Sequence, residues 1–203
     1  MNRGEHVVEW GWAGAALAGE PESGDAHVVV HLPGAALVAV IDGLGHGIEA
    51  AAAAQQAART IEARALQPLD RIVEECHEAL RRSRGAVMSL ATFDARASVL
   101  SWLAVGNVEA VLLRRDPLQE RRETITPRGG IVGYQIPSLR PATIPISPGD
   151  TLVMATDGIR GSFIENLTAA EGPARLARSI LAAHARGSDD SLVLAARFVG
   201  LSP

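Results

Sequence analysis

The chain has 203 residues, 47% of them hydrophobic and 21% charged, a composition that excludes general disorder and supplies the core of one domain. Nineteen basic and 23 acidic residues give a net charge of −4, so no overall positive field attracts nucleic acid or anionic membranes. The one cysteine, Cys76, excludes an internal disulfide framework and fits a reducing compartment. We therefore expect a single domain over residues 1–203, in the cytoplasm, with neither nucleic-acid nor membrane partners.

The N-terminal part of the chain predicts short strands. Val7–Trp12 and Ala15–Ala18 are expected to form an opening pair, followed by turn residues up to Asp25. Ala26–His31 is rich in β-branched residues, and Ala35–Ile41 is a continuous apolar run typical of a strand buried on both faces. These two segments predict a hairpin.

Two helices are expected next. Ile48–Leu66 contains strong helix formers without Gly or Pro, and Pro68 follows it. Leu69–Arg84 carries apolar residues on one helical face, and Gly85 ends it.

From Ala86 the hydrophobic period changes to two, which predicts a series of strands. One further helix is expected at Pro173–Arg186. The predicted strands are Ala86–Phe93, Ser98–Val105, Val108–Arg114, Glu123–Thr126, Ala142–Ile146, Thr151–Thr156 and Ser191–Val199. Because the strands are grouped instead of alternating with helices, we predict an α+β fold: an antiparallel β-sandwich flanked by α-helices.

Aspartates recur at the ends of the apolar strands: Asp25, Asp42, Asp157 and the pair Asp189 and Asp190. A carboxylate at the edge of a buried strand is costly unless it is paired or binds a cation. Mg²⁺ and Mn²⁺ prefer carboxylate, carbonyl and water oxygens, so convergence of these side chains would indicate a divalent metal site. An Asp-Gly pair is also an ordinary turn, and composition alone leaves both interpretations open.

The motif IDGLGHG resembles the signature of the PPM (type 2C) metal-dependent protein serine/threonine phosphatases. SGDAH, ATDGI and SDDSLVLAARF resemble other motifs of that family in the same order, and GGIVGY and AVGNVEA resemble segments of its small bacterial members. The resemblance spans residues 20–199. Within the family, the chain is most similar to the SpoIIE-like branch and to its short members that act in the stressosome. The family resemblance implies αββα layers.

The resemblance also implies roles for individual residues. Asp42 would bridge two Mg²⁺ or Mn²⁺ ions, and the Gly43 carbonyl would bind one of them. Asp157 and Asp189 would bind the other ion, and Asp25 would lie nearby. Whether Asp189 or its neighbour Asp190 faces the metal stays open. The implied reaction is attack of a metal-activated water on phosphoserine or phosphothreonine.

His46 is a second candidate catalytic residue, because its imidazole could give a proton to the leaving oxygen. Its alternative role is to cap the following helix together with Gly47. The family's animal enzymes hold phosphate through an arginine just before the first acidic motif, but the corresponding segment here, GEPESG, contains none.

The resemblance implies phosphorylated STAS-domain proteins of a stressosome as substrates, with the reset of stress signalling as the outcome. The alternative is a metal-binding but catalytically inactive scaffold in a signalling complex. A nuclease is disfavoured by the acidic balance and by an aromatic content of only 3%. The oligomeric state is left open.

Overall fold

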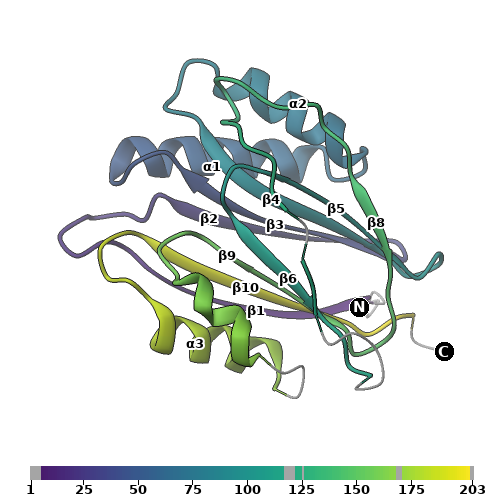
Figure 1. Cartoon of the computed structure of the whole chain (residues 1–203). Coiled ribbons are helices and arrows are strands. Elements are labelled where there is room, and N and C mark those ends of the chain that lie inside the picture. The colour runs from purple at the N-terminus through teal and green to yellow at the C-terminus, as the bar shows by residue number, and fades with distance from the viewer. Residues whose placement is uncertain (1–5, 117–121, 125, 168–170, 202–203) are drawn as a thin grey trace, which may run out of the picture.

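The computed structural model describes residues 6–116, 122–124, 126–167 and 171–201. Within these residues, two five-stranded antiparallel sheets pack against each other. Helices α1 and α2 cover the outer face of one sheet, and α3 covers the outer face of the other (Figure 1). The predicted α+β fold, an antiparallel β-sandwich flanked by helices, is confirmed.

The first sheet has the strand order β2-β3-β4-β5-β8. Its hairpin of β2 and β3 is the one that the sequence predicts, with Asp25 opposite Asp42 at the open end. Apolar side chains of this sheet pack against the two helices that connect β3 to β4. The bounds are β2 Asp25–Leu32, β3 Ala35–Gly43, α1 Ile48–Ala63, α2 Leu69–Leu80, β4 Ala86–Asp94, β5 Val99–Val105 and β8 Ala142–Pro145.

The second sheet has the order β1-β10-β9-β6-β7, so the first and last strands of the chain are neighbours. Its outer face is covered by α3, whose buried residues include Leu176 and Ile180. A short 3₁₀ helix, η1, lies between β9 and α3 in the sequence. The bounds are β1 Val8–Ala15, β6 Glu109–Leu113, β7 Arg122–Thr124, β9 Thr151–Ala155, η1 Gly161–Asn166, α3 Pro173–His184 and β10 Ser191–Phe198.

Large side chains from both sheets fill the space between them. Phe93 and Trp102 of the first sheet belong to the same buried cluster as Phe198 of the second, and the rings of Phe93 and Phe198 stack at 6.2 Å. The Trp102 indole Nε1 donates to the hydroxyl of Ser89 at 2.9 Å, so its polar atom is satisfied inside the core. This core fixes the two sheets relative to each other.

The predicted strand at Ala15–Ala18 is wrong. All eight residues of β1 pair with β10, from Val8 opposite Phe198 to Ala15 opposite Ser191. The first strand therefore continues through the predicted break. It ends at Ala15 because Ser191, opposite it, is the first residue of β10. The strands predicted at Ala142–Ile146 and Thr151–Thr156 both form, but they lie in different sheets.

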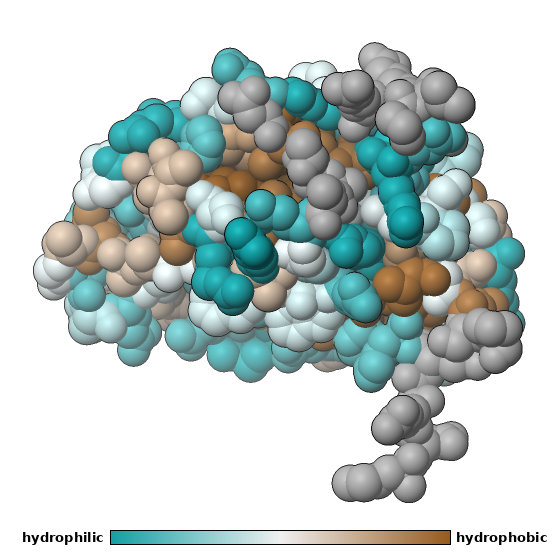
Figure 2. Space-filling model, turned by 90° about the horizontal axis from the view of Figure 1, so that it is seen from below, coloured by the Kyte–Doolittle hydropathy of each residue, from teal (hydrophilic) through white to brown (hydrophobic). Residues whose placement is uncertain are grey.

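The outer face of α3 is polar. Figure 2 views the molecule from below Figure 1, the side on which α3 lies, and hydrophilic side chains cover much of this face. Arg175, Arg178 and Ser179 are among the exposed residues of α3. In the part of the chain that the structure describes, no helix has the length and apolar character needed to cross a membrane.

Candidate metal centre

The open ends of four strands meet at one edge of the sandwich. Asp25 begins β2, and Asp42 lies near the end of β3 in the same sheet. In the other sheet β9 and β10 are antiparallel neighbours, so the turn after β9 and the turn before β10 lie at the same edge. These turns carry Asp157 and the pair Asp189 and Asp190. Segments far apart in the sequence thus bring the five predicted aspartates to one region.

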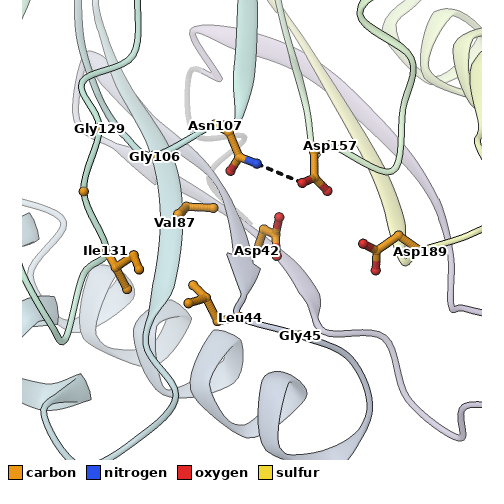
Figure 3. Close-up of a pocket in the computed structure, with 11 residues that line it drawn as sticks. Asp42, Leu44, Gly45, Val87, Gly106, Asn107, Gly129, Ile131, Asp157 and Asp189 are labelled. Carbon is orange, nitrogen blue, oxygen red and sulfur yellow. Dashed lines mark hydrogen bonds between the residues drawn. The ribbon is translucent and has the colours of Figure 1, made fainter.

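Three of these aspartates line a common cavity of about 440 Å³. Figure 3 shows the carboxylates of Asp42, Asp157 and Asp189 pointing into the same space from both sheets. Asn107, in the turn before β6, also lines the cavity and donates from Nδ2 to Oδ2 of Asp157 at 2.8 Å. The other lining residues are Leu44, Gly45, Val87, Gly106, Gly129, Gly130 and Ile131.

Asp25 lies close to the other carboxylates at the base of the hairpin. Thr156, at the end of β9, donates its hydroxyl to Oδ2 of Asp25 at 2.8 Å and accepts the amide of Leu192 at 2.9 Å. The single hydroxyl of Thr156 therefore connects the first sheet to β9 and β10 of the second.

Asp190 uses both carboxylate oxygens on backbone amides. Oδ1 accepts from the amide of Leu17 at 2.8 Å, and Oδ2 accepts from the amide of Gly24 at 2.7 Å. Asp190 is 4% exposed and is absent from the residues that line the cavity, whereas Asp189 is among them. The structure thus turns Asp189 toward the cavity and Asp190 toward the segment before β2.

Burial and like charges raise the pKa values of two of these groups. Burial, followed by the charges of Asp157, Asp189 and Asp190, raises the pKa of Asp42 to about 7. Burial, followed by the charges of Asp42, Asp190 and Asp157, raises the pKa of Asp25 to about 8, although the hydrogen bond from Thr156 acts in the opposite direction. The carboxylates therefore lie within range of one another's charge.

The donor set fits a hard divalent cation. The charged groups that line the cavity are carboxylates, and a cation would offset both the burial and the repulsion that raise the pKa values of Asp25 and Asp42. Across the described residues, no three Asp, Glu, His or Cys side chains already lie close enough together to hold an ion.

Two glycines allow the close approaches on which this edge depends. A Cβ on Gly43 would lie 2.2 Å from the carbonyl oxygen of Ala50 in α1. A Cβ on Gly158 would lie 1.8 Å from the carbonyl oxygen of Asp190. Glycine in the two Asp-Gly pairs thus permits tight backbone packing beside Asp42 and Asp157.

His46 lies outside the set of residues that line the cavity. Its Nδ1 is 2.6 Å from Oε1 of Glu20, and its side chain is 58% exposed. The alternative capping role gains no support from side-chain geometry, because Gly47 is the N-cap of α1 and no side chain makes a cap hydrogen bond there.

Sequence reasoning missed the partners of the aspartates. Asn107 was visible only as part of a Gly-Asn turn, and Thr156 only as the last residue of a strand. The position of Thr156 directly before Asp157 was a usable signal, because a hydroxyl at a strand end can bond to a neighbouring strand. Glu20, the partner of His46, gave no comparable signal.

Comparisons with known proteins agree with this architecture. The family model of Stage II sporulation protein E (SpoIIE) matches residues 33–199. The phosphoserine phosphatase RsbX of Bacillus subtilis (strain 168) is 26% identical over 123 residues, which are 61% of this chain and 60% of RsbX. The match thus spans less than two thirds of that relative.

Solved structures share the fold over most of the chain. A structure from work on the bacterial stressosome, described as a modular system adapted to control secondary messenger signaling, has a TM-score of 0.84 at 33% identity and covers 94% of this chain and 99% of its own. RsbX in complex with magnesium has a TM-score of 0.84 at 20% identity, with 94% and 95% covered. The serine/threonine phosphatase PstP/Ppp of Mycobacterium tuberculosis has a TM-score of 0.75 at 15% identity, with 95% and 99% covered. The chain therefore belongs to the SpoIIE family, and it shares the fold of PP2C-type phosphatases.

Proposed function

We propose that this protein is a Mg²⁺- or Mn²⁺-dependent phosphatase that removes phosphate from phosphoserine or phosphothreonine in small stressosome proteins. The observation that carries the proposal is the convergence of carboxylates from both sheets on one cavity, where burial and then the neighbouring negative charges raise the pKa of Asp42 to about 7. Such an arrangement is costly to fold and is relieved by divalent cations.

We assign the metal ligands from the residues around the cavity. Asp42, Asp157 and Asp189 would hold two ions, together with the carbonyl of Gly43, and Asp25 would lie beside them as a weaker or water-mediated ligand. Asp190, whose two oxygens accept backbone amides, would act through its charge and by fixing the turn that carries Asp189.

The chain's own groups hold this arrangement in place. Divalent ions bound here would acidify water and neutralise negative charge on the phosphoryl group. Asn107 holds one oxygen of Asp157, and Thr156 holds one oxygen of Asp25, so these carboxylates keep their orientation. The described cavity lining contains neither Ser nor Cys, and its aspartates are assigned here to the metal ions, which leaves water as the attacking group.

The catalytic role of His46 stays a proposal. To protonate a leaving oxygen, its ring would have to turn away from Glu20 toward the cavity. The exposed position of the His46 side chain allows that movement, whereas its short contact with Glu20 opposes it.

The proposed substrates are phosphorylated STAS-domain proteins of a stressosome. Support comes from the relative named phosphoserine phosphatase RsbX and from the neighbour studied as part of the bacterial stressosome. Removal of their phosphate would reset stress signalling, and action on such substrates would place the protein in the cytoplasm.

One observation favours an alternative function. Among the described residues, no group of three or more His, Cys, Asp or Glu side chains is arranged to hold a metal ion. If the carboxylates that line the cavity do not come together around metal ions, the protein would bind partners without hydrolysing phosphate. It would then act as an inactive scaffold of a signalling complex.

Hydrolysis of p-nitrophenyl phosphate with Mn²⁺, with Mg²⁺ and with EDTA separates the two functions. We expect turnover that depends on the added metal and disappears with EDTA. The same incubation with phosphorylated STAS-domain proteins should release phosphate, as followed by mass spectrometry. A folded protein that dephosphorylates neither substrate in the presence of Mn²⁺ would support the scaffold and contradict the phosphatase.

A further inference from the structure

Arg84 lies in the turn between α2 and β4, next to the loop that follows Asp42. The amide of Leu44 donates to the carbonyl oxygen of Gly85 at 3.0 Å, which ties the two segments together. A Cβ on Gly85 would lie 2.8 Å from Cγ2 of Ile131. Leu44 and Ile131 both line the acidic cavity, and Figure 3 shows them at the same end of it. The turn that carries Arg84 therefore borders the cavity.

The guanidinium group of Arg84 packs against Gly45. Gly45 has a φ of +86°, and a Cβ at this position would lie 2.8 Å from Nη1 of Arg84. Gly45 is itself one of the residues that line the cavity. Glycine thus serves two purposes here, because it adopts a left-handed conformation and leaves space for a cation at the cavity rim.

A phosphate group that enters the acidic cavity would require a positively charged side chain nearby. Among the described lining residues, every charged side chain is an aspartate, and none is basic. A phosphate monoester carries up to two negative charges, and guanidinium is well suited to bind two of its oxygens at once. The segment GEPESG before β2 supplies no arginine for this purpose. Arg84 brings a guanidinium to the rim from a different part of the chain.

The present partner of Arg84 is one that phosphate can replace. Nη2 of Arg84 is 2.5 Å from Oε2 of Glu49 in the first turn of α1, with side chains 48% and 69% exposed. Ion pairs this exposed contribute little free energy, because water screens them. We infer that Arg84 binds the phosphate group of the substrate at the rim of the acidic cavity, and that Glu49 competes with phosphate for its guanidinium. This inference rests on the proposed phosphatase function.

A purely structural ion pair is the competing explanation, since Arg84 and Glu49 also connect α1 to the turn before β4. The two explanations predict opposite effects for one substitution. If Arg84 binds phosphate, Glu49→Gln removes a competitor and strengthens phosphate binding. If the pair only holds the two segments together, Glu49→Gln and Arg84→Gln lower the melting temperature and raise the KM to a similar extent.

The experiment measures phosphate affinity in four variants and the parent protein. Arg84→Gln should raise the KM for p-nitrophenyl phosphate and the inhibition constant of inorganic phosphate by about tenfold, as expected for loss of a hydrogen bond to a charged group. Arg84→Lys should recover part of that loss, because it keeps the charge without the planar fork. Glu49→Gln should lower both constants by about twofold. In the double variant that combines Arg84→Gln with Glu49→Gln, the Glu49 substitution should no longer lower either constant.

The matched control is Arg81→Gln. Arg81 is a neighbouring exposed arginine at the end of α2, and it forms an ion pair with Glu78 three residues earlier. Its loss should leave the KM and the inhibition constant unchanged. Equal increases in KM for Arg84→Gln and Glu49→Gln, with parallel losses in melting temperature, would overturn the inference. So would an unchanged inhibition constant in Arg84→Gln.

Calorimetric titration of each variant with O-phosphoserine in the presence of Mg²⁺ separates this inference from the proposed function. Absence of turnover in the parent protein would contradict the phosphatase. The dissociation constant for O-phosphoserine would still test Arg84, and we expect it to rise by about tenfold in Arg84→Gln. Equal dissociation constants in the parent and in Arg84→Gln would reject the role of Arg84.

Discussion

The buried carboxylate of Asp42 has a cost in stability. Burial and three neighbouring aspartates all raise its pKa, and no hydrogen bond offsets them in the way that Thr156 does for Asp25. A buried carboxylate in this position is unfavourable for folding alone. The position therefore makes physical sense when a cation binds there.

The first prediction concerns Asp42→Asn. The amide is nearly the same size but carries no charge, so we expect metal-dependent hydrolysis of p-nitrophenyl phosphate to fall by about a hundredfold or more. In EDTA, without metal, the melting temperature of Asp42→Asn should equal or exceed that of the parent protein, because repulsion with Asp157 and Asp189 is removed. Glu62→Gln, an exposed carboxylate on α1, is the control. An active Asp42→Asn enzyme would contradict the mechanism.

The second prediction is that the free energy of unfolding of the metal-free protein, prepared with EDTA, depends on pH. The pKa values of Asp25 and Asp42 are raised from 3.8 to about 8 and about 7 in the folded state. The folded protein then holds more protons than the unfolded chain between about pH 4 and pH 8, so the free energy of unfolding falls as the pH rises through this window.

Denaturation by urea at pH 5 and at pH 8, with EDTA and with Mg²⁺, checks this dependence. Without metal, the protein should be more stable at pH 5 by at least about 1 kcal/mol. Mg²⁺ should stabilise it more at pH 8, where the carboxylates are charged. A chelated protein with greater stability at pH 8 would show that these aspartates do not control the effect.

The sequence located the acidic residues because each follows or precedes an apolar strand, a pattern that a local reading can detect. It could not separate Asp189 from Asp190, since the difference arises from amides of Leu17 and Gly24, far away in the chain. Arg84 gave no sequence signal either, because its contacts with Gly45 and Glu49 depend on how the turn packs against α1.

At the scale of elements, the approach of β9 and β10 depends on Gly158. Its missing side chain leaves room for the carbonyl of Asp190, and the hydroxyl of Ser191 donates to the carbonyl of Gly158 at 3.1 Å. The two turns that present Asp157 and Asp189 are therefore held together by a close backbone contact and by a hydrogen bond from the Ser191 side chain.

The third prediction follows from this contact. Gly158→Ala should lower the free energy of unfolding by about 2 kcal/mol or more and should reduce metal-dependent turnover, because the turns must separate. Gly172→Ala provides the control, since nothing lies within 4 Å of a Cβ there and φ is −65°. Because Gly172 is the N-cap of α3, where alanine is less favourable than glycine, this substitution should cost only about 0.5 kcal/mol. Equal stability of both variants in urea denaturation would disprove the role of the close contact.

Most elements were predictable because their hydrophobic periods are strong. The helices at α1, α2 and α3 and the hairpin of β2 and β3 form where the sequence indicates them. The break predicted near Ala15 failed because β10 supplies a partner along all of β1, which local turn residues do not reveal. The assignment of β8 and β9 to different sheets likewise depends on long-range pairing with β5 and β10.

For the whole molecule, the cluster between the sheets joins residues from both halves of the sequence, including Val38, Trp102 and Leu194. Because the two sheets share one core and one acidic edge, we predict that the chain folds as a single domain.

The fourth prediction tests that unity. In urea, tryptophan fluorescence and far-ultraviolet circular dichroism should report the same transition midpoint for the chelated protein. The fluorescence comes from Trp102, which is buried between the sheets, and from the more exposed Trp10 and Trp12 of β1, whereas circular dichroism reports on all helices and strands. Separate midpoints for the two signals would indicate parts that unfold independently.

The pairing of β1 with β10 has a consequence for synthesis on the ribosome. During synthesis, β1 must wait without its hydrogen-bonding neighbour until β10, Ser191–Phe198, has left the exit tunnel. Asp189 and Asp190 emerge just before that neighbour, so a nascent chain cannot assemble the acidic edge. The acidic edge is thereby completed only after residues 189–198 have been synthesised.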